Sequence, residues 1–196
     1  MDDKSVRIAR RSEESRIAHL MTLAFAREPI CRFQYPDPWD YAIHFPEFTR
    51  LYAGNAFEHG CAHTIGDGIA AALWLPPGVH PDEEALTAHL ERSVSPARLG
   101  PLMAMMEAMG KNHPEEPHWF LPLIGVDPFY HGQGHGSVLL RYRLAACDRE
   151  GQLAYLDSSN PTNIPFYENH GFELLASIPL GSEVKMYPML RRPRRG

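Results

Sequence analysis

The residues best suited to chemistry form a glycine-rich turn that follows an apolar stretch, Leu121–Val126. The turn consists of His131, Gly132, Gln133, Gly134, His135 and Gly136. Glycine lets the backbone adopt positive φ angles and approach a ligand closely. The segment from Ser137 to Arg149 predicts a helix, whose N-terminus adds unpaired N–H donors and a positive dipole end. Turn and helix together predict a cradle for a pyrophosphate group, with Ser137 placed to donate to it.

The glycine pattern alone does not choose between phosphate-containing ligands. It lacks the Gly-Lys-Ser/Thr ending of a nucleoside triphosphate loop. A dinucleotide fold would place the turn near the start of a long βαβ series, with an acidic residue about 20 residues further on. Asp157 lies near that distance, but the chain that remains is short for such a sheet. A nucleotide-dependent enzyme is therefore a weaker alternative, and it predicts binding of ATP or NAD.

A second pattern lies downstream, from Asn160 to Phe172, and includes Tyr167. Both segments, in this order, resemble the two signature motifs of the GNAT N-acetyltransferase superfamily: Gln/Arg-x-x-Gly-x-Gly/Ala, then Asn-x7-Tyr-x3-Gly-Phe. His131 takes the Gln/Arg position and six residues, not seven, separate Asn160 from Tyr167. The segments HWFLPLIGV, NIPFYENHGF and YPMLRRP further resemble the branch that contains puromycin N-acetyltransferase.

The resemblance implies acetyl-CoA as the co-substrate and assigns roles to these residues. Backbone groups of Ile124 and Val126 would pair with the pantetheine arm, and the amides from His131 to Ser137 would hold the pyrophosphate. The N–H of Val126 or its neighbour would polarise the thioester carbonyl. Tyr167 would protonate the departing thiolate, and Asn160 would contact CoA while also capping a helix.

The general base is the least defined part of the expected site. The family places an acidic residue on the strand before the glycine turn, but Phe120 stands at that position here. His118 lies two residues earlier, on the same face of the strand, and an imidazole suits a base near neutral pH. Glu115 and Glu116 are close enough in sequence to act through water. His131 and His135 are expected to be solvated loop residues beside the cradle.

The surrounding sequence predicts the elements that position these residues. Expected strands are Val6–Ile8, Cys61–Ile65, Gly68–Leu75, Trp119–Val126, Leu153–Leu156, Phe172–Ile178 and Val184–Leu190, with helical segments between them. With the resemblance, this predicts an α/β fold with a GNAT-type mixed, mostly antiparallel central sheet. That sheet would have about six or seven strands, flanked by helices and splayed at the strand before the glycine turn.

Two segments of the N-terminal half are candidates for the acceptor side. From Cys31 to Pro46 the chain is aromatic and interrupted by prolines, which predicts an irregular segment, and Phe48, Leu51 and Tyr52 predict a helix that continues to about Glu58. The aromatic segment Cys31–Phe57 would line a pocket or pack in the core. Residues Pro81–Asn112 predict a helical insert in two pieces, broken near Pro96, with a methionine-rich second piece. A pocket enclosed by these segments would favour a small acceptor, and an open groove would favour a peptide.

Length and composition predict one globular domain over residues 1–196. The expected parts are an acceptor side (about 1–117), an acetyl-CoA-binding and C-terminal part (about 118–190), and a solvated basic tail (191–196). The net charge of −5, from 19 basic and 24 acidic residues, argues against nucleic-acid binding. No apolar run reaches the ~20 residues of a membrane span, and the first residues lack the apolar core of a signal peptide.

The three cysteines, Cys31, Cys61 and Cys147, are widely spaced, which argues against a disulfide framework or a metal site and favours the cytoplasm. A monomer and a homodimer are equally consistent with the sequence; Val184–Leu190 would pair across a dimer if it formed an exposed edge.

Three functions stay open. The first is an enzyme that acetylates a primary amine of a small molecule. The second is a protein or peptide N-acetyltransferase. The third is a non-catalytic acyl-CoA-binding sensor, favoured by His131 and the missing strand carboxylate but opposed by Tyr167.

Overall fold

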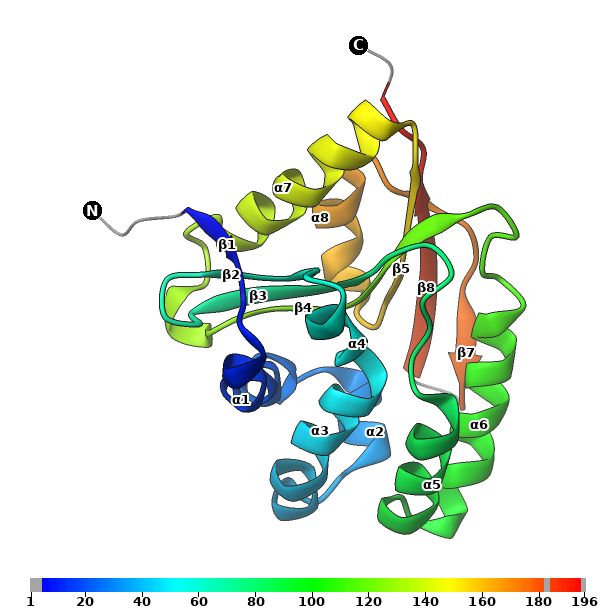
Figure 1. Cartoon of the computed structure of the whole chain (residues 1–196). Coiled ribbons are helices and arrows are strands. Elements are labelled where there is room, and N and C mark those ends of the chain that lie inside the picture. Colours follow the sequence, from blue (N-terminus) through cyan, green and yellow to red (C-terminus); the bar gives the residue numbers. More distant parts are fainter. Residues whose placement is uncertain (1–4, 182–183, 195–196) are drawn as a thin grey trace.

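The computed structural model describes residues 5–181 and 184–194 (Figure 1). An eight-stranded sheet forms its centre, in the order β1-β2-β3-β4-β5-β8-β6, with β7 also paired to β8. Among these strands β4 and β5 are parallel, and the other neighbours are antiparallel. The strands are β1 Val6–Ile8, β2 Ala62–Ile65, β3 Ala70–Leu75, β4 His118–Val126, β5 Leu153–Ser158, β6 Glu173–Leu174, β7 Ile178–Leu180 and β8 Val184–Arg191. The predicted mixed, mostly antiparallel sheet is confirmed.

Helices cover both faces of the sheet (Figure 1). One face carries α7 (His135–Glu150) and α8 (Ile164–Glu168). The opposite side carries α1 Glu14–Phe25, α2 Pro29–Gln34, α3 Pro38–Ala53, α4 Asn55–Glu58, α5 Glu83–Ser93 and α6 Pro96–Gly110. Three short 3-10 turns complete the chain: η1 Arg11–Glu13, η2 Pro128–Tyr130 and η3 Pro161–Asn163. Within the described residues, no helix is both long enough and apolar enough to cross a membrane.

Strand periodicity divides the interior into two cores. Along β3, Leu73 and Leu75 pack on the side of α1 to α6, whereas Ala72 and Trp74 pack on the side of α7. This alternation follows from the two-residue repeat of a strand, which sends successive side chains to opposite faces. A sheet buried on both faces explains why all six residues of β3 are buried and apolar.

The sheet opens between β4 and β5. Their parallel pairing runs from His118 opposite Leu153 to Leu121 opposite Leu156 and ends there. The next residue of β4 is Pro122, which has no N–H to continue a ladder. The register of β4 against β3 also shifts between Leu73 and Leu75, as in a β-bulge. Proline and bulge together account for the predicted splay.

The aromatic segment Cys31–Phe57 is largely helical, also in its first part, Cys31–Pro46, for which an irregular chain is predicted. It contains most of α2, all of α3, and α4 as far as Phe57, which confirms the helix predicted from Phe48 to about Glu58. Two of its helices begin with proline, Pro29 and Pro38, at the first helical position, where a missing N–H costs nothing. Pro46 lies inside α3. The buried face of this helix, which includes Tyr41 and Phe45, packs in the core and holds the helix together despite the proline. The prolines therefore mark helix starts more than breaks.

The C-terminal strands differ from the prediction in two ways. The single expected strand Phe172–Ile178 is two strands, β6 and β7, and the interruption lies opposite Pro188, which cannot donate a hydrogen bond. This split raises the number of strands to eight. The expectation that Val184–Leu190 offers an edge for a dimer is wrong, because β8 lies between β5 on one side and β6 and β7 on the other.

The basic tail is also more ordered than expected. Arg191 is the last residue of β8, only 3% exposed, and donates two hydrogen bonds of 2.8 Å to the carboxylate of Asp148. Its Nε donates to the carbonyl of His170, and the Arg194 amide donates to Asp148. A bidentate arginine–carboxylate pair is a strong contact, so the start of the tail is structural. Residues 195 and 196 of the predicted tail lie outside the described residues.

A buried histidine under α7 leads to a prediction on pH and stability. His63 on β2 is 1% exposed, and its Nε2 lies 3.3 Å from Nη2 of Arg143, whose guanidinium stacks on Trp119. Burial, and then the charge of Arg143, lower the pKa of His63 to about 4. The pKa of His63 is lower in the folded than in the unfolded protein. Its contribution to the unfolding free energy is therefore fully present above about pH 7 and is lost as the pH falls from about 6.5 to 4.

We expect urea unfolding to show a loss of about 2 kcal/mol between pH 7.5 and 5 from this histidine. The His63→Gln variant should lose this component of the pH dependence. The matched variant His59→Gln, at an exposed histidine, should keep it. Equal pH dependence in wild type and His63→Gln would contradict the assignment.

Candidate functional site

The splay between β4 and β5 opens a cavity of about 400 Å³, which we call the slot. The hydrogen bond from the Asp127 amide to the Ile69 carbonyl shows which opposite residues of β3 and β4 are hydrogen-bonded to each other. Hydrogen-bonded and non-bonded pairs alternate in an antiparallel ladder. Ile124 and Val126, opposite Ala72 and Ala70, occupy non-bonded positions, so their peptide groups face away from β3. Both residues line the slot and direct their backbone groups toward it.

The glycine turn closes one end of the slot. Gly132 and Gly134 have φ angles of 76° and 83°, in the left-handed region that favours glycine. The helix α7 begins at His135, two residues earlier than predicted, and its first bond runs from the Val138 amide to the Gly134 carbonyl. The amides of His135, Gly136 and Ser137 therefore lie at the helix N-terminus without a partner within the helix. The lining includes His131, Gly132, Gly134, His135 and Gly136, whereas Gln133 and Ser137 do not line the slot.

The two histidines of the turn have different environments. His131 is exposed, as expected, and its Nε2 lies 3.0 Å from the Val126 carbonyl oxygen. The imidazole thus occupies one of the backbone acceptors that face the slot. His135 is not a solvated loop residue: it is 1% exposed, and neither ring nitrogen has a hydrogen-bond partner among the described residues. Its position in the first turn of α7 directs the ring inward, against the ring of Tyr130.

Tyr167 lies on α8 and lines the slot. It is 8% exposed, packed against Phe166 and Phe172. Burial, and then the nearby charge of Glu28, raise the pKa of the Tyr167 hydroxyl well above its usual range. A phenol in this environment stays protonated throughout the neutral range.

The asparagines near Tyr167 differ in position. Asn160 caps η3, since its side-chain oxygen accepts from the amide and hydroxyl of Thr162 at 3.0 and 2.8 Å. It does not line the slot, whereas Asn163 does. Asn160 Nδ2 and Ser159 Oγ both donate to the carboxylate of Glu28, at 3.4 and 2.7 Å. Glu28 thus joins the start of α2 to the loop after β5.

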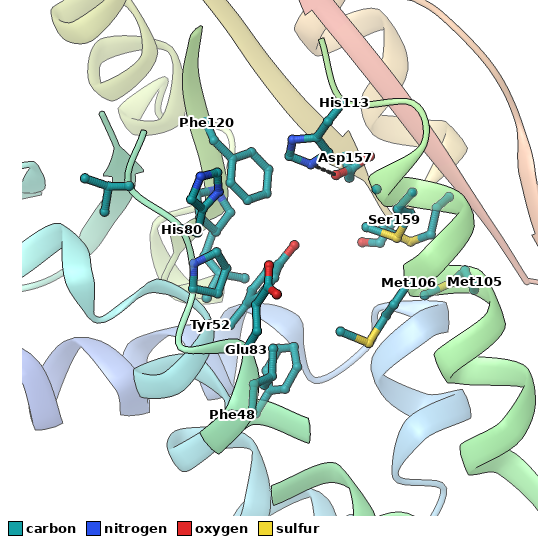
Figure 2. Close-up of a pocket in the computed structure, with 18 of the residues that line it drawn as sticks. Phe48, Tyr52, His80, Glu83, Met105, Met106, His113, Phe120, Asp157 and Ser159 are labelled. Atoms are coloured by element: carbon teal, nitrogen blue, oxygen red, sulfur yellow. Dashed lines mark ion pairs between the residues drawn. The ribbon is translucent and has the colours of Figure 1, made fainter. Parts of the chain in front are cut away.

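A second and larger cavity, of about 900 Å³, adjoins the slot. Figure 2 shows aromatic and methionine side chains around it, from α3, α6 and β4. Both segments predicted for the acceptor side contribute to its lining. Four residues line the cavity and the slot alike: Phe25, Pro122, Asp157 and Ser159. We call this shared wall the junction.

Asp157 is the ionisable group of the junction. Its side chain is 3% exposed, at the end of β5, and Oδ1 accepts a hydrogen bond of 2.9 Å from the Tyr155 hydroxyl. Oδ2 has no hydrogen-bond partner among the described residues and lies 3.7 Å from Nε2 of His113 (Figure 2). A buried carboxylate with an unsatisfied oxygen is costly unless a ligand completes it.

His118 lines the larger cavity but not the slot. Its Nδ1 lies 2.9 Å from the Glu116 carbonyl, and its ring centroid lies 5.5 Å from that of His113. Burial is the main cause that lowers the pKa of His118 below its usual value. Phe120, at the position of the expected carboxylate, is buried and packs edge-on against His113. Glu115 and Glu116 also line the cavity and are exposed.

The sequence analysis does not identify His113, Glu28 or Ser159 as site residues. It names Asp157 only as a possible ligand of a dinucleotide. One available signal was an acidic residue directly after the apolar strand Leu153–Leu156, next to a parallel neighbour. The other three come from separate segments, so no spacing rule joins them. Within the described residues, no group of three or more His, Cys, Asp or Glu side chains is arranged to hold a metal ion.

The sequence profile of the Acetyltransferase (GNAT) family matches residues 68–172, just over half of the chain, including β4, the glycine turn and Tyr167. The chain belongs to the GNAT acetyltransferase family. This GNAT chain is 28% identical over 163 residues to an N-acetyltransferase of Schizosaccharomyces pombe, covering 74% of the chain and 66% of that protein. It therefore spans just under two thirds of the length of that relative.

Solved structures confirm the GNAT fold. A Corynebacterium glutamicum structure described as histone acetyltransferase HPA2 and related acetyltransferase has a TM-score of 0.68 at 20% identity, covering 98% of this chain and 97% of that one. A Drosophila melanogaster polyamine N-acetyltransferase has a TM-score of 0.65 at 15% identity, covering 96% and 99%. A mosquito arylalkylamine N-acetyltransferase-like protein has 0.64 at 15% identity, again covering 96% and 99%. At these identities the likeness concerns the fold alone.

Proposed function

We propose that this protein is an N-acetyltransferase that moves the acetyl group of acetyl-CoA directly to a primary amine of a small molecule. The junction carries this proposal, because a donor in the slot and an acceptor in the larger cavity would meet there. Solved relatives of this fold include enzymes named for polyamine and arylalkylamine acetylation, which supports a small amine. We propose the acceptor side to be formed mainly by residues 1–117 and the donor side by residues 118–190.

In this proposal the pantetheine arm of acetyl-CoA adds to the free edge of β4. The backbone of Ile124 would pair with it, and Val126 would offer only its N–H, since the Val126 carbonyl already accepts from His131. The amides at the start of α7 and the glycine turn would hold the pyrophosphate, where partial positive charge is concentrated. Most of the rate enhancement would then come from positioning two reactants in one site.

The transfer itself needs two proton movements. The neutral amine attacks the thioester carbonyl, whose oxygen is polarised by the N–H of Val126, since the N–H of Asp127 is bonded to the Ile69 carbonyl, and a C–N bond forms. The C–S bond then breaks, and Tyr167 donates its proton to the CoA thiolate. As the amide forms, the nitrogen loses a proton, which restores the Tyr167 hydroxyl, so the net products are the amide, CoA and the one proton released when the ammonium ion became neutral.

The proton of the ammonium ion would leave through Asp157 and His113. Both are close to the junction, and Asp157 presents an unsatisfied oxygen there. His118 would take the proton onward to the mouth of the cavity, since its lowered pKa keeps the imidazole neutral at pH 7. His118 is thus proposed as the outer member of a relay and not as the group that touches the amine.

Two other functions are tested by the same experiments. A peptide acceptor is less favoured because α3, α5 and α6 all contribute walls to the acceptor cavity. A non-catalytic acyl-CoA sensor would bind acetyl-CoA but release no CoA with any amine. We also propose that the chain belongs to the branch of the family that contains puromycin N-acetyltransferase. The segments HWFLPLIGV, NIPFYENHGF and YPMLRRP support this proposal.

Calorimetric titration with acetyl-CoA, ATP and NAD is the first experiment. We expect micromolar binding of acetyl-CoA alone, followed by amine-dependent release of CoA thiol. Binding of ATP or NAD in place of acetyl-CoA would overturn the proposal. Acetyl-CoA binding without CoA release for a broad panel of amines would support the sensor instead.

The glycine turn provides a matched pair of variants for the donor site. Gly134 and Gly151 lie at the two ends of α7, both with positive φ, and a Cβ would meet no atom within 4 Å at either. Alanine at either position costs about 1 kcal/mol of backbone strain. We expect Gly134→Ala to weaken acetyl-CoA binding about tenfold or more, because a shift in the turn misplaces the amides. Gly151→Ala should lose similar stability but bind acetyl-CoA normally; equal affinities would contradict the cradle.

A further inference from the structure

The buried part of the acceptor cavity is almost entirely apolar. The lining residues with less than a tenth of their surface exposed come from α2, α3, α5, α6, β4 and β8. Apart from Gln34 they are apolar or a cysteine: Cys31, Phe45, Leu86, Leu90, Leu102, Met105, Met109, Phe120, Leu123 and Met186. We call this set the apolar wall. Met106 extends it toward the cavity centre, opposite Phe48 (Figure 2).

Negative charge around the cavity is unevenly distributed. Asp157 is the buried carboxylate, and it lies at the junction with the slot. The other acids of the lining, Glu83, Glu115 and Glu116, are exposed residues, and Glu83 points its carboxylate into the cavity beside Tyr52 (Figure 2). No lysine or arginine is found among the described residues that line the cavity. One cationic head beside Asp157 would therefore be neutralised. The apolar wall offers no carboxylate for a second, and pairing with the solvent-exposed carboxylate of Glu83 would contribute little.

The unsatisfied Oδ2 of Asp157 supports the same orientation. It lacks a hydrogen-bond partner among the described residues although it is buried, and an ammonium N–H would complete it. A second ammonium group against the apolar wall would lose its hydration without a partner, at a large cost. Hydrocarbon in the same place would gain from burial, and the unbranched thioethers of Met105 and Met106 would adapt to its shape.

We propose that the acceptor is an amphipathic primary amine, with its amino group beside Asp157 and a bulky aliphatic or aromatic body against the apolar wall. This inference rests on the proposed acetyltransferase function and narrows its substrate to monoamines with a large apolar part. Diamines and polyamines are disfavoured for this chain, even though a solved relative of the same fold is named for polyamine acetylation.

The test compares amines of equal length, with saturating acetyl-CoA. Butylamine, hexylamine and octylamine form one series, and the corresponding α,ω-diamines form the other, with 4-phenylbutylamine as a bulky member. We expect kcat/KM to rise about threefold to fourfold per added methylene in the monoamine series. Each diamine should fall at least about 100-fold below the monoamine of the same length. Calorimetry of the same amines with the CoA-bound protein gives binding without turnover.

A pair of variants on α6 tests the place of the body. Met106→Glu puts a carboxylate into the cavity and should reduce the octylamine-to-diaminooctane ratio of kcat/KM at least about tenfold. Ala104→Glu adds the same charge to an exposed position of the same helix and should leave that ratio unchanged. Equal ratios in both variants would overturn the proposed orientation.

The outcomes separate this inference from the function on which it rests. Turnover that favours diamines would overturn the inference and keep the acetyltransferase. Binding in the expected order without any CoA release would support the ligand class and overturn the enzyme. Absence of binding and turnover for all the monoamines would overturn the inference, whatever acetyl-CoA does.

Discussion

Replacement of Tyr167 by phenylalanine is expected to lower kcat by about 10²- to 10⁴-fold, with acetyl-CoA affinity nearly unchanged. The substitution removes a single oxygen from a ring that is otherwise held by Phe166 and Phe172. Its packing should therefore survive, and the loss should be confined to proton donation. Steady-state kinetics, with calorimetry for the donor, measure both quantities.

The raised pKa of Tyr167 determines how this effect depends on pH. Because burial keeps the phenol protonated throughout the neutral range, its ionisation should not limit activity below about pH 9. Wild type and Tyr167→Phe should then differ by a constant factor from pH 6 to 9. Tyr142→Phe, at a half-exposed tyrosine on α7, is the matched control and should retain full activity. A loss in Tyr167→Phe that is no larger than in Tyr142→Phe would remove Tyr167 from the proposed mechanism.

Replacement of Asp157 by asparagine is expected to lower kcat/KM for the amine by about 100-fold or more. Asparagine keeps the shape and can still accept from Tyr155, but it is neutral, so it can neither pair with an ammonium ion nor take up its proton. The unfolding free energy should stay equal or rise, since the variant no longer buries an incompletely paired carboxylate. Urea unfolding and amine kinetics on the same preparation test both statements.

The pH profile distinguishes a proton-transfer role of Asp157 from a purely structural one. Without the relay, the enzyme depends on amine that is already neutral, so kcat/KM of Asp157→Asn should rise about tenfold per pH unit up to the pKa of the amine. Wild type should rise less steeply. His113→Gln should resemble Asp157→Asn, whereas His118→Gln should have a smaller effect because His118 lies one step further from the junction. A larger loss in His118→Gln than in Asp157→Asn would reverse the proposed order of the relay.

The sequence by itself determined the parts of this protein that depend on neighbouring residues. Gly134 needs a positive φ, Pro122 cannot continue a ladder, and the run from Ile164 to Glu168 forms a helix that ends before Gly171. These are local backbone rules, which act over a few residues. The glycine turn and the helix that carries Tyr167 were therefore predictable from local rules, and the splayed strand was expected from the family resemblance that these two segments carry.

The tertiary structure decided which of these residues share an environment. His135 is buried, although its sequence neighbours suggest a loop, because α7 begins at that residue and packs on the sheet. Asp157 and His113 meet only when β5 and the segment after α6 are brought together, and α6 supplies the wall that makes the cavity apolar. Burial and contact across the fold depend on how distant segments pack. A sequence pattern determines the shape of each segment but not which distant segment lies opposite it.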